Sequence, residues 1–267
     1  MSKIEVNNVY LDYTDNDENT YSALEGVSFH VEEGEFVSII GSSGCGKSTI
    51  LGLLSGIRPY KSGTVLIDGS PVTGPGKNRS IVFQHYSLFA WMTSKQNVCF
   101  GLKQAFGDKS DKEIAEIAEH YLEIVGLKEF QDKYPFQLSG GMQQRVAIAR
   151  TLSMKTDIIF MDEPFGAIDA KNRMALQDLL LELLENEKEK KTIVFVTHDM
   201  DEAILLSDRT LFMRTKRIER DIDIGIPRPR VREKLFRGDR YAEIRREIME
   251  LFYENVMENS VAGEVYL

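Results

Sequence analysis

The residues best suited to chemistry form a glycine-rich stretch, GSSGCGKST, at positions 41–49. It fits the pattern G-x-x-x-x-G-K-[ST] through Gly41, Gly46, Lys47 and Ser48. Glycines allow successive backbone N–H groups to turn inward around an anion. The lysine can reach the outer phosphates of a nucleotide, and the hydroxyl can bind Mg²⁺. The stretch therefore predicts a binding loop for nucleotide phosphates.

The segments on either side of this loop are those that a phosphate site needs. An apolar run at 36–40 predicts a buried strand before the loop, and a helical pattern of apolar residues at 50–54 follows it. A helix that starts at the loop adds its positive N-terminal end to the site, and this context disfavours a chance match to the pattern. The residues expected to hold the phosphates are Gly41, Ser42, Ser43, Gly44, Cys45, Gly46, Lys47, Ser48 and Thr49.

Two adjacent carboxylates end another apolar run, IIFMDEP at 158–164. A strand that stops at Asp162 and Glu163 would deliver both side chains to the carboxyl edge of a parallel sheet, where α/β folds bind ligands. Asp162 is then a candidate ligand of a phosphate-bridging Mg²⁺, and Glu163 a candidate base for an attacking water. The alternative is an ordinary strand end before a turn at Pro164. The phosphate loop in the same chain favours the catalytic interpretation.

A third stretch, LSGGMQQR at 138–145, predicts a second anion-binding helix end. Ser139 is a suitable N-cap residue, and Gly140 and Gly141 leave the N–H groups of the first turn uncovered. One chain would thus carry two helix N-termini that can each face a phosphate.

The bulk properties exclude several classes of protein. The 267 residues carry a formal net charge of −9 with a pI near 5.1, which argues against a chain that holds nucleic acid electrostatically. No apolar window reaches the length of about 18 residues that a membrane-spanning helix needs, and the N-terminus lacks a signal-peptide layout. The two cysteines, Cys45 and Cys99, suit a reducing compartment, so we expect a cytosolic chain.

Strand and helix patterns alternate along the chain and predict an α/β core. The clearest helix covers 113–125, with a capping box from Ser110 and Glu113 and a stop at Gly126. The strands expected to be buried on both faces cover 36–40, 80–83, 158–161, 192–196 and 210–213.

Three regions depart from this alternation. The first thirty or so residues and 64–68 are typical of short strands in a small antiparallel sheet. The pattern between 84 and 157 is mostly helical, which suggests a helical insertion. After Asp221 a connector rich in Pro and Arg leads to a final amphipathic helix.

The phosphate loop, LSGGMQQR and IIFMDEP, in this order and spacing, resemble the nucleotide-binding subunit of an ABC transporter from Val9 to Met213. The resemblance implies an α/β fold: a P-loop NTPase (RecA-like) core with a mainly parallel sheet, a small antiparallel β subdomain and an inserted helical subdomain. It places the ATPase domain at 1–225, the helical subdomain at about 85–157, and a C-terminal connector and amphipathic helix at 226–267. It also implies ATP and Mg²⁺ as cofactors.

The resemblance further assigns roles to single residues. Gln84 matches the family's glutamine that senses Mg²⁺ and water, His198 the histidine that contacts the γ-phosphate, and Asp169 the aspartate that reaches across a dimer. Tyr13 is the candidate for the aromatic that stacks on adenine, with Tyr10 and Tyr21 as alternatives. The expected set is Glu163, His198 and Gln84 for catalysis, Ser48, Gln84 and Asp162 for Mg²⁺, and Tyr13, Ser139, Gly140, Gly141, Gln143 and Asp169 for nucleotide contacts beyond the loop.

Two anion-binding helix ends in one chain predict a dimer. The phosphate loop leaves the γ end of a nucleotide exposed, and the Ser139 helix end, on a different subdomain, can best serve the nucleotide of a second subunit. A homodimer with two-fold symmetry lets each chain contribute both halves. We expect ATP to tighten this dimer and hydrolysis to loosen it.

Apolar residues Leu88, Phe89, Trp91 and Met92 cluster in a segment expected at the surface. They predict a groove for a helix of integral membrane permease subunits; the alternative is core packing. The chain would then lie at the cytoplasmic face of the membrane, with a solute-binding protein as indirect partner and no nucleic acid. The FAWMT segment at 89–93 and the Pro-Arg-Pro-Arg connector are similar to the nitrate/sulfonate/taurine importer group. An exporter or a soluble mechanical or repair ATPase is the alternative.

Two further expectations concern charge. Cys45, at the start of a helix, is expected to have a lowered thiol pKa and a reactivity from which ATP protects it. The basic residues of the tail are expected to form a solvated surface, with lipid head groups as the alternative contact. These residues are Arg228, Arg230, Arg232, Lys234 and Arg237.

Overall fold

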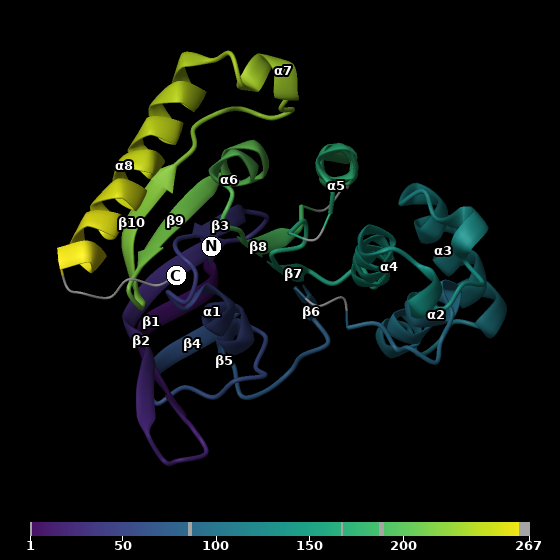
Figure 1. The fold of residues 1–267 in the computed structure, drawn as a ribbon. Coiled ribbons are helices and arrows are strands. Elements are labelled where there is room, and N and C mark those ends of the chain that lie inside the picture. The colour runs from purple at the N-terminus through teal and green to yellow at the C-terminus, as the bar shows by residue number, and fades with distance from the viewer. Residues whose placement is uncertain (1, 85–86, 167, 187–189, 262–267) are drawn as a thin grey trace. The chain divides into compact units, whose positions relative to one another are not determined.

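The computed structural model describes residues 2–84, 87–166, 168–186 and 190–261. The chain divides into two compact units (Figure 1). The first unit comprises Met1–Gly74 and Val194–Leu267, and the second comprises Pro75–Ile193. Strand β8 (Thr192–Val196) begins in the second unit and ends in the first.

The first unit contains an antiparallel sheet of strand order β2-β1-β4-β5. Its two long strands cover 13 residues each, whereas the sequence predicts short strands. Register shifts interrupt the ladder between them, one of them around Asn8, which has a φ of 49°. Because each shift breaks the inward-outward alternation, one long strand looks like several short ones in the sequence. The strands are β1 (Ser2–Thr14), β2 (Thr20–Glu32), β4 (Ser62–Ile67) and β5 (Ser70–Pro71).

The same unit contains the strand series β10-β9-β3 and, next to β3, the part of β8 from Val194 onward. Strands β3 (Phe36–Ile40) and β9 (Arg209–Arg214) pair in parallel, and β10 (Arg217–Asp223) pairs antiparallel with β9. Strand β3 is buried along its whole length, which explains why it is apolar apart from Ser38. The helices of this unit are α1 (Lys47–Leu54), α6 (Met200–Leu206), α7 (Arg232–Leu235) and α8 (Asp239–Val261).

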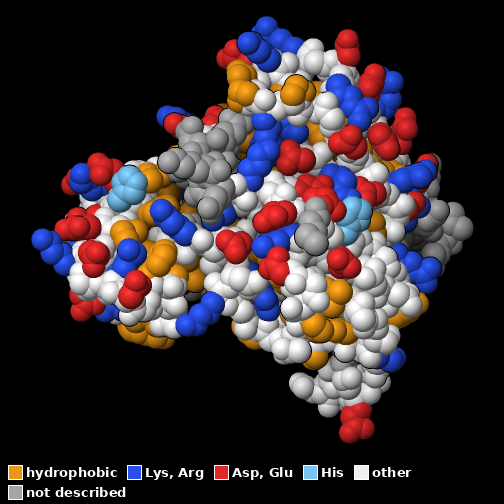
Figure 2. All heavy atoms as spheres, turned by 180° about the vertical axis from the view of Figure 1, so that it is seen from behind, with side chains coloured by type: hydrophobic (Ala, Val, Ile, Leu, Met, Phe, Trp, Pro, Cys, Tyr) orange, Lys and Arg blue, Asp and Glu red, His pale blue; other side chains and the backbone are white. Residues whose placement is uncertain are grey.

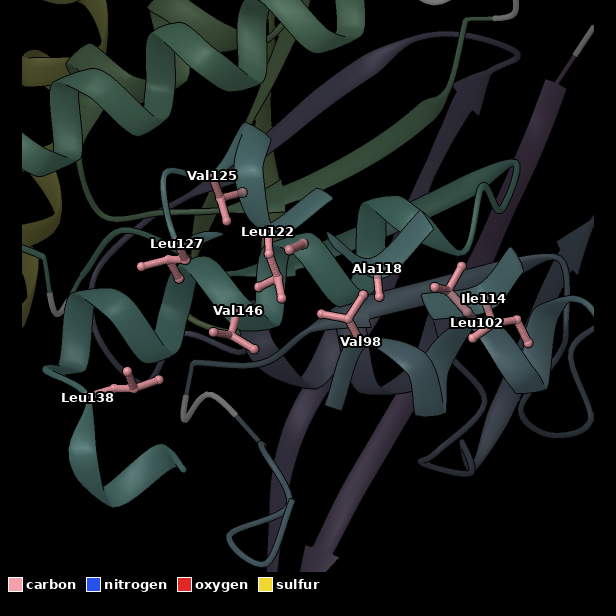
Figure 3. Packing of buried hydrophobic residues seen from close by; sticks show 10 residues of the cluster. Val98, Leu102, Ile114, Ala118, Leu122, Val125, Leu127, Leu138 and Val146 are labelled. Carbon is pink, nitrogen blue, oxygen red and sulfur yellow. The ribbon is translucent and has the colours of Figure 1, made fainter. Parts of the chain in front are cut away.

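The second unit pairs the parallel strands β6 (Arg79–Val82) and β7 (Ile158–Asp162) and is otherwise mostly helical. Helices α2, α3 and α4 share an apolar core that includes Val98, Leu122 and Val146 (Figure 3). Its helical segments are α2 (Ser94–Ala105), α3 (Asp111–Ile124), η1 (Lys128–Phe130), η2 (Pro135–Gln137), α4 (Gly140–Ser153) and α5 (Ala170–Asn186).

The predicted capping box of α3 is confirmed. The Glu113 backbone N–H donates to Ser110 Oγ at 3.3 Å, and the Ser110 N–H donates to Glu113 Oε2 at 2.8 Å. Gly126 follows the helix at a φ of 71°, a conformation that favours glycine.

Charged side chains of both signs are interspersed on the face shown in Figure 2. Ion pairs of the structure include that of Lys61 with Asp12, at 2.6 Å. Within the described part of the chain, no helix combines the length and apolar character that crossing a bilayer requires.

Candidate active site

The glycine-rich loop lies between β3 and α1, as predicted. Gly46 caps α1 at a φ of 111°, and a Cβ there would lie 2.7 Å from Met213 Cε and 2.9 Å from the Ala23 carbonyl oxygen. Gly44 has a φ of 77°, and a Cβ at that position would meet no atom within 4 Å. The loop therefore needs glycine at Gly46 for space and conformation, and at Gly44 for conformation alone.

Lys47 extends back across this loop. Its ammonium donates to the carbonyl oxygens of Gly41 and Ser42, both at 2.9 Å, and the residue is only 6% exposed. Among the described residues no carboxylate pairs with it. A buried cation held only by neutral oxygens favours an anion beside it, so the loop fits the triphosphate of a nucleotide.

The structure contradicts the expectation for Cys45. The residue is buried and precedes the N-cap of α1, and burial raises the pKa of its thiol. The charge of Lys47, whose Nζ lies 4.0 Å from the sulfur, opposes this shift but is the smaller effect. The prediction of a lowered pKa was wrong because helix position suggests a positive field while the cost of burial is invisible in the sequence.

Tyr13, the candidate for adenine stacking, reaches the loop from β1. Its hydroxyl lies 3.0 Å from Thr49 Oγ1, and the Arg58 guanidinium lies over its ring at 5.0 Å from the centroid. The alternatives Tyr10 and Tyr21 are more exposed, and the Tyr21 hydroxyl donates to Asp15 at 3.1 Å. The structure thus brings Tyr13 and the phosphate loop together within the first unit.

His198 lies between β8 and α6, one residue before the helix cap Asp199, and it is exposed. Its neighbours are tightly bonded: Asp199 caps α6 by accepting from the Asp201 N–H at 2.8 Å, and Thr197 Oγ1 donates to Glu202 at 2.6 Å. The backbone on both sides of His198 is therefore fixed.

In the second unit, β7 ends at Asp162, and Glu163 follows with a φ of 43°. This left-handed conformation is unfavourable for a residue with a side chain, and such strain clusters at functional sites. Gln84 Nε2 donates to Glu163 Oε2 at 3.4 Å, so the predicted base and the predicted sensing glutamine lie together.

The LSGG stretch has the predicted helix cap. Ser139 Oγ accepts from the Met142 N–H at 3.3 Å at the start of α4, and Gln143 Nε2 donates to the Leu138 carbonyl at 3.2 Å. A Cβ on Gly141 would lie 3.7 Å from Ile168, so the residue before Asp169 packs against this helix end.

Two residues that the sequence interpretation missed join this stretch to Asp169. Arg145 donates to Asn172 Oδ1 at 2.6 Å, and Asn172 donates to Asp169 through its side chain at 2.6 Å and its backbone at 3.1 Å. The hydrogen bonds from Asn172 lower the pKa of Asp169. The i to i+3 spacing of Asp169 and Asn172 is the only sequence signal for this chain of contacts.

Comparisons with known proteins assign the family. A family model described as ABC transporter matches residues 24–166. The chain belongs to the ABC transporter family. The nitrate import ATP-binding protein NrtD of Synechococcus elongatus is 44% identical over 236 residues, which cover 87% of this chain and 85% of that protein. The bicarbonate transport ATP-binding protein CmpC of the same species is 43% identical over 86% of this chain and 35% of that protein.

A solved structure shows the same fold. A dimeric post-hydrolysis state of an ATP-binding cassette with ADP and Pi has a TM-score of 0.75 and 33% sequence identity, and the match covers 82% of this chain and 98% of that one. The present chain is thus an ABC ATPase that binds ATP, with the α/β fold of P-loop NTPases, as the sequence predicts.

The expected docking segment of this ABC ATPase is partly exposed and partly packed. Trp91 is 72% exposed, and its ring centroid lies 5.4 Å from that of Phe89, which in turn lies 4.7 Å from that of Phe100. Leu88 packs against the apolar core of the second unit. The segment therefore exposes the Trp91 ring, while Leu88 and Phe89 are partly buried beneath the surface.

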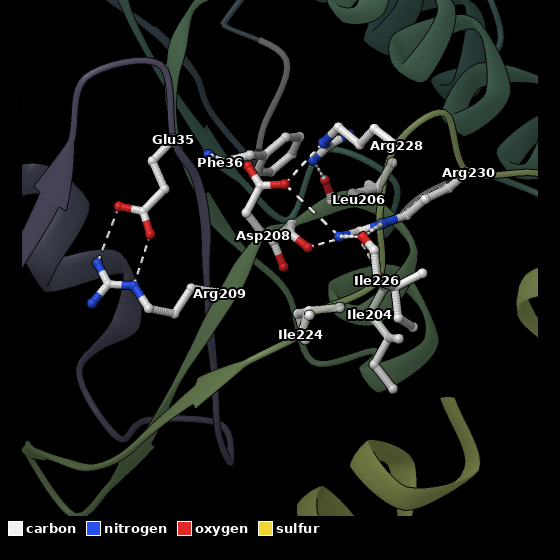
Figure 4. Close-up of polar contacts among 12 residues, drawn as sticks. Glu35, Phe36, Ile204, Leu206, Asp208, Arg209, Ile224, Ile226, Arg228 and Arg230 are labelled. Carbon is white, nitrogen blue, oxygen red and sulfur yellow. Dashed lines mark hydrogen bonds and ion pairs between the residues drawn. The ribbon is translucent and has the colours of Figure 1, made fainter. Parts of the chain in front are cut away.

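The expectation of a solvated basic tail is wrong for two residues of this ABC ATPase. Arg230 has a side chain only 2% exposed, and its guanidinium donates to carbonyl oxygens at the end of α6 (Figure 4). Arg228 donates to the Leu206 carbonyl and to Asp208. Unpaired carbonyls at a helix C-terminus attract cations, and the sequence does not reveal which distant helix supplies them. Lys234 and Arg237 are exposed, as expected.

Proposed function

We propose that this ATPase supplies energy to a membrane importer of a small oxyanion such as nitrate, sulfonate or taurine. The observation that carries this proposal is the similarity to the nitrate import protein NrtD over most of both chains. The relative CmpC is named for bicarbonate, another small oxyanion. The chain itself would lie at the cytoplasmic face of the membrane, attached through permease subunits.

The solute can be tested by co-purifying the ATPase with its permease and solute-binding protein. After reconstitution in liposomes, we expect nitrate, a sulfonate or taurine to stimulate ATP hydrolysis and to accumulate on the side of the ATPase. Mass spectrometry of the co-purified solute gives an independent identification. Outward movement, or stimulation only by a solute that is not an oxyanion, would contradict the proposal.

Within the site, the phosphate loop and Lys47 would hold the β and γ phosphates. Ser48, Asp162 and Gln84 offer a hydroxyl, a carboxylate and an amide oxygen, the oxygen donors that Mg²⁺ prefers. Bound Mg²⁺ would neutralise charge that develops on the phosphate oxygens.

The reaction itself would depend on two side chains. Glu163 would orient the attacking water and accept its proton, and His198 would contact the γ-phosphate. The strained backbone at Glu163 and its bond to Gln84 support the first role, because both fix the carboxylate before substrate binds.

We further propose that the working form is a homodimer in which the Ser139 helix end and Asp169 of one chain face the nucleotide of the other. The dimeric cassette with ADP and Pi supports this arrangement. A Glu163→Gln variant should bind ATP without hydrolysing it, so ATP and Mg²⁺ should convert it from monomer to dimer on size-exclusion chromatography with light scattering. A variant that stays monomeric at saturating ATP would argue against the shared site.

The exposed aromatic segment would dock the permease. Trp91→Ala should leave hydrolysis by the free subunit unchanged and abolish stimulation in the reconstituted importer. Tyr253→Ala, which removes another exposed aromatic, is the control and should leave both activities unchanged. Loss of the free subunit's activity in Trp91→Ala would show that the segment is needed for folding instead.

A further inference from the structure

Helix α6, which starts two residues after His198, is held at both ends by the described part of the C-terminal tail, residues 226–261. At its C-terminus, Arg230 Nη1 donates to the carbonyls of Ile204 at 3.0 Å and Ser207 at 2.6 Å, as Figure 4 shows for this region. The same guanidinium donates to the Ile226 carbonyl within the connector, which fixes the orientation of the Arg230 side chain. These bonds fix where α6 ends.

At its N-terminus, α6 is held by α8. The Tyr241 hydroxyl donates to Asp201 Oδ1 at 2.7 Å, and Arg245 Nε donates to the same oxygen at 3.1 Å. Tyr241 is buried beside Phe236, with ring centroids 5.0 Å apart. Burial and the bond to Asp201 raise the pKa of Tyr241, so its phenol stays protonated and keeps donating. We call these two bonds the Asp201 clamp.

The clamp connects to His198 through a short series of bonds. Asp201 is the second residue of α6, and its N–H donates to Asp199 Oδ1, the cap of the helix. Asp199 in turn donates its N–H to Thr197 Oγ1 at 3.0 Å. His198 lies between Thr197 and Asp199, so a shift of the first turn of α6 would move its backbone.

The clamp is better suited to positioning than to overall stability. The side chains of Asp201 and Arg245 are each 42% exposed, and exposed ion pairs contribute little to global stability. Helix α6 has only seven residues and is too short to be stable alone, so its contacts decide where its first turn lies.

We propose that Tyr241 and Arg245 are positioning residues that hold His198 in place for ATP hydrolysis by clamping Asp201. This inference rests on the proposed contact of His198 with the γ-phosphate. The tail is then a working part of the hydrolytic site, although it lies far from His198 in the sequence.

The test uses two conservative variants of the full chain, each with a matched control on α8. Tyr241→Phe removes only the donating hydroxyl, and Tyr253→Phe makes the same change at an exposed tyrosine. Arg245→Gln removes the positive charge of the clamp. Arg246→Gln removes a positive charge from the exposed neighbouring residue, which is not part of the clamp. Neither Tyr253 nor Arg246 has a hydrogen-bond partner among the described residues.

We expect each clamp variant to lower kcat by about three- to tenfold while KM for ATP changes by less than about twofold. The controls should match the wild type, and the loss of one hydrogen bond should lower the unfolding midpoint of a clamp variant by no more than about 0.5 M urea. Amide hydrogen exchange at residues 199–203 should accelerate in the clamp variants only. Wild-type kcat, or unchanged exchange in this segment, would overturn the proposal.

A double-mutant cycle with His198→Ala separates this inference from the role assumed for His198. If the clamp acts through His198, Tyr241→Phe should cost nothing further in the His198→Ala background. An equal additional loss in that background would overturn the clamp proposal alone. Wild-type turnover of His198→Ala would instead overturn the proposed role of His198. Amide hydrogen exchange at residues 199–203 can be measured without turnover. It therefore shows whether the clamp orders the start of α6 even when His198→Ala is inactive.

Discussion

Replacing Arg230 with methionine tests whether the tail caps α6. The contacts of the guanidinium include five with four carbonyl oxygens, at Ile204, Leu205, Ser207 and Ile226, and an ion pair with Asp208 at 3.8 Å. Nη1 has only two hydrogens for its three contacts, so the contacts together stabilise the folded state by about as much as four hydrogen bonds. At about 1 kcal/mol each, their loss costs about 4 kcal/mol. Burying methionine does not require the desolvation of a charge, and this offsets part of the lost hydrogen-bond energy. We therefore expect the free energy of unfolding to fall by about 3 kcal/mol in total.

The assay is urea unfolding followed by far-ultraviolet circular dichroism. With an m value of about 3 kcal/mol/M, the midpoint should fall by about 1 M. Arg246→Met is the matched control, because Arg246 is exposed, and it should change the stability by less than about 0.5 kcal/mol. If Arg230→Met unfolds at the same midpoint as the control, the buried guanidinium does not stabilise the end of α6 and the capping interpretation fails.

Three further outcomes follow from the site. Gly46→Ala should lower the free energy of unfolding by about 1–3 kcal/mol, because of the φ of 111° and the clash with Met213, and it should also weaken ATP binding. Gly69→Ala is the control, since Gly69 has a φ of 69° but open space around it. Isothermal titration calorimetry should show unchanged ATP binding in Gly69→Ala. Cys45 should be alkylated at least about tenfold more slowly than free glutathione at neutral pH, because burial raises its pKa and lowers the thiolate fraction; faster labelling by mass spectrometry would contradict this. Asn172→Ala should raise the pKa of Asp169 toward its ordinary value in a carboxyl NMR titration. In the wild type, the stabilisation from this carboxylate is present above its ordinary pKa and is lost as the pH falls through the folded pKa.

The parts of the fold that local sequence determines could be predicted. Strands β3, β7 and β8 are continuous apolar runs because both faces are buried, and the caps of α3 and α4 follow from Ser110 and Ser139, whose partners are three residues away. The length of β1 could not be predicted, because bulges break its alternation. A periodic pattern reveals a ladder only while the register is kept.

In the candidate site, too, the features that depend on local sequence could be predicted and those that depend on tertiary packing could not. The position of Lys47 and its loop between β3 and α1 was predicted correctly because the loop consists of consecutive residues between a recognisable strand and helix. The pKa of Cys45 depends on how deeply the thiol is buried, and the contact of Arg145 with Asn172 joins residues 27 positions apart. The local sequence determines neither the burial of Cys45 nor the contact of Arg145 with Asn172, because both depend on tertiary packing.

The tail shows why a charged residue is the hardest kind to place from sequence. Arg228, Arg230 and Arg237 look alike in a polar stretch, yet Arg237 faces solvent while the other two donate to the end of α6. What distinguishes them is the unpaired carbonyl groups of a helix that ends some twenty residues earlier. A helix as short as α6 depends on such partners for its order, so we expect the tail to hold the segment after His198 in its helical conformation. The boundary between ATPase domain and tail at residue 225, drawn from motifs alone, therefore separates residues that are hydrogen-bonded to each other.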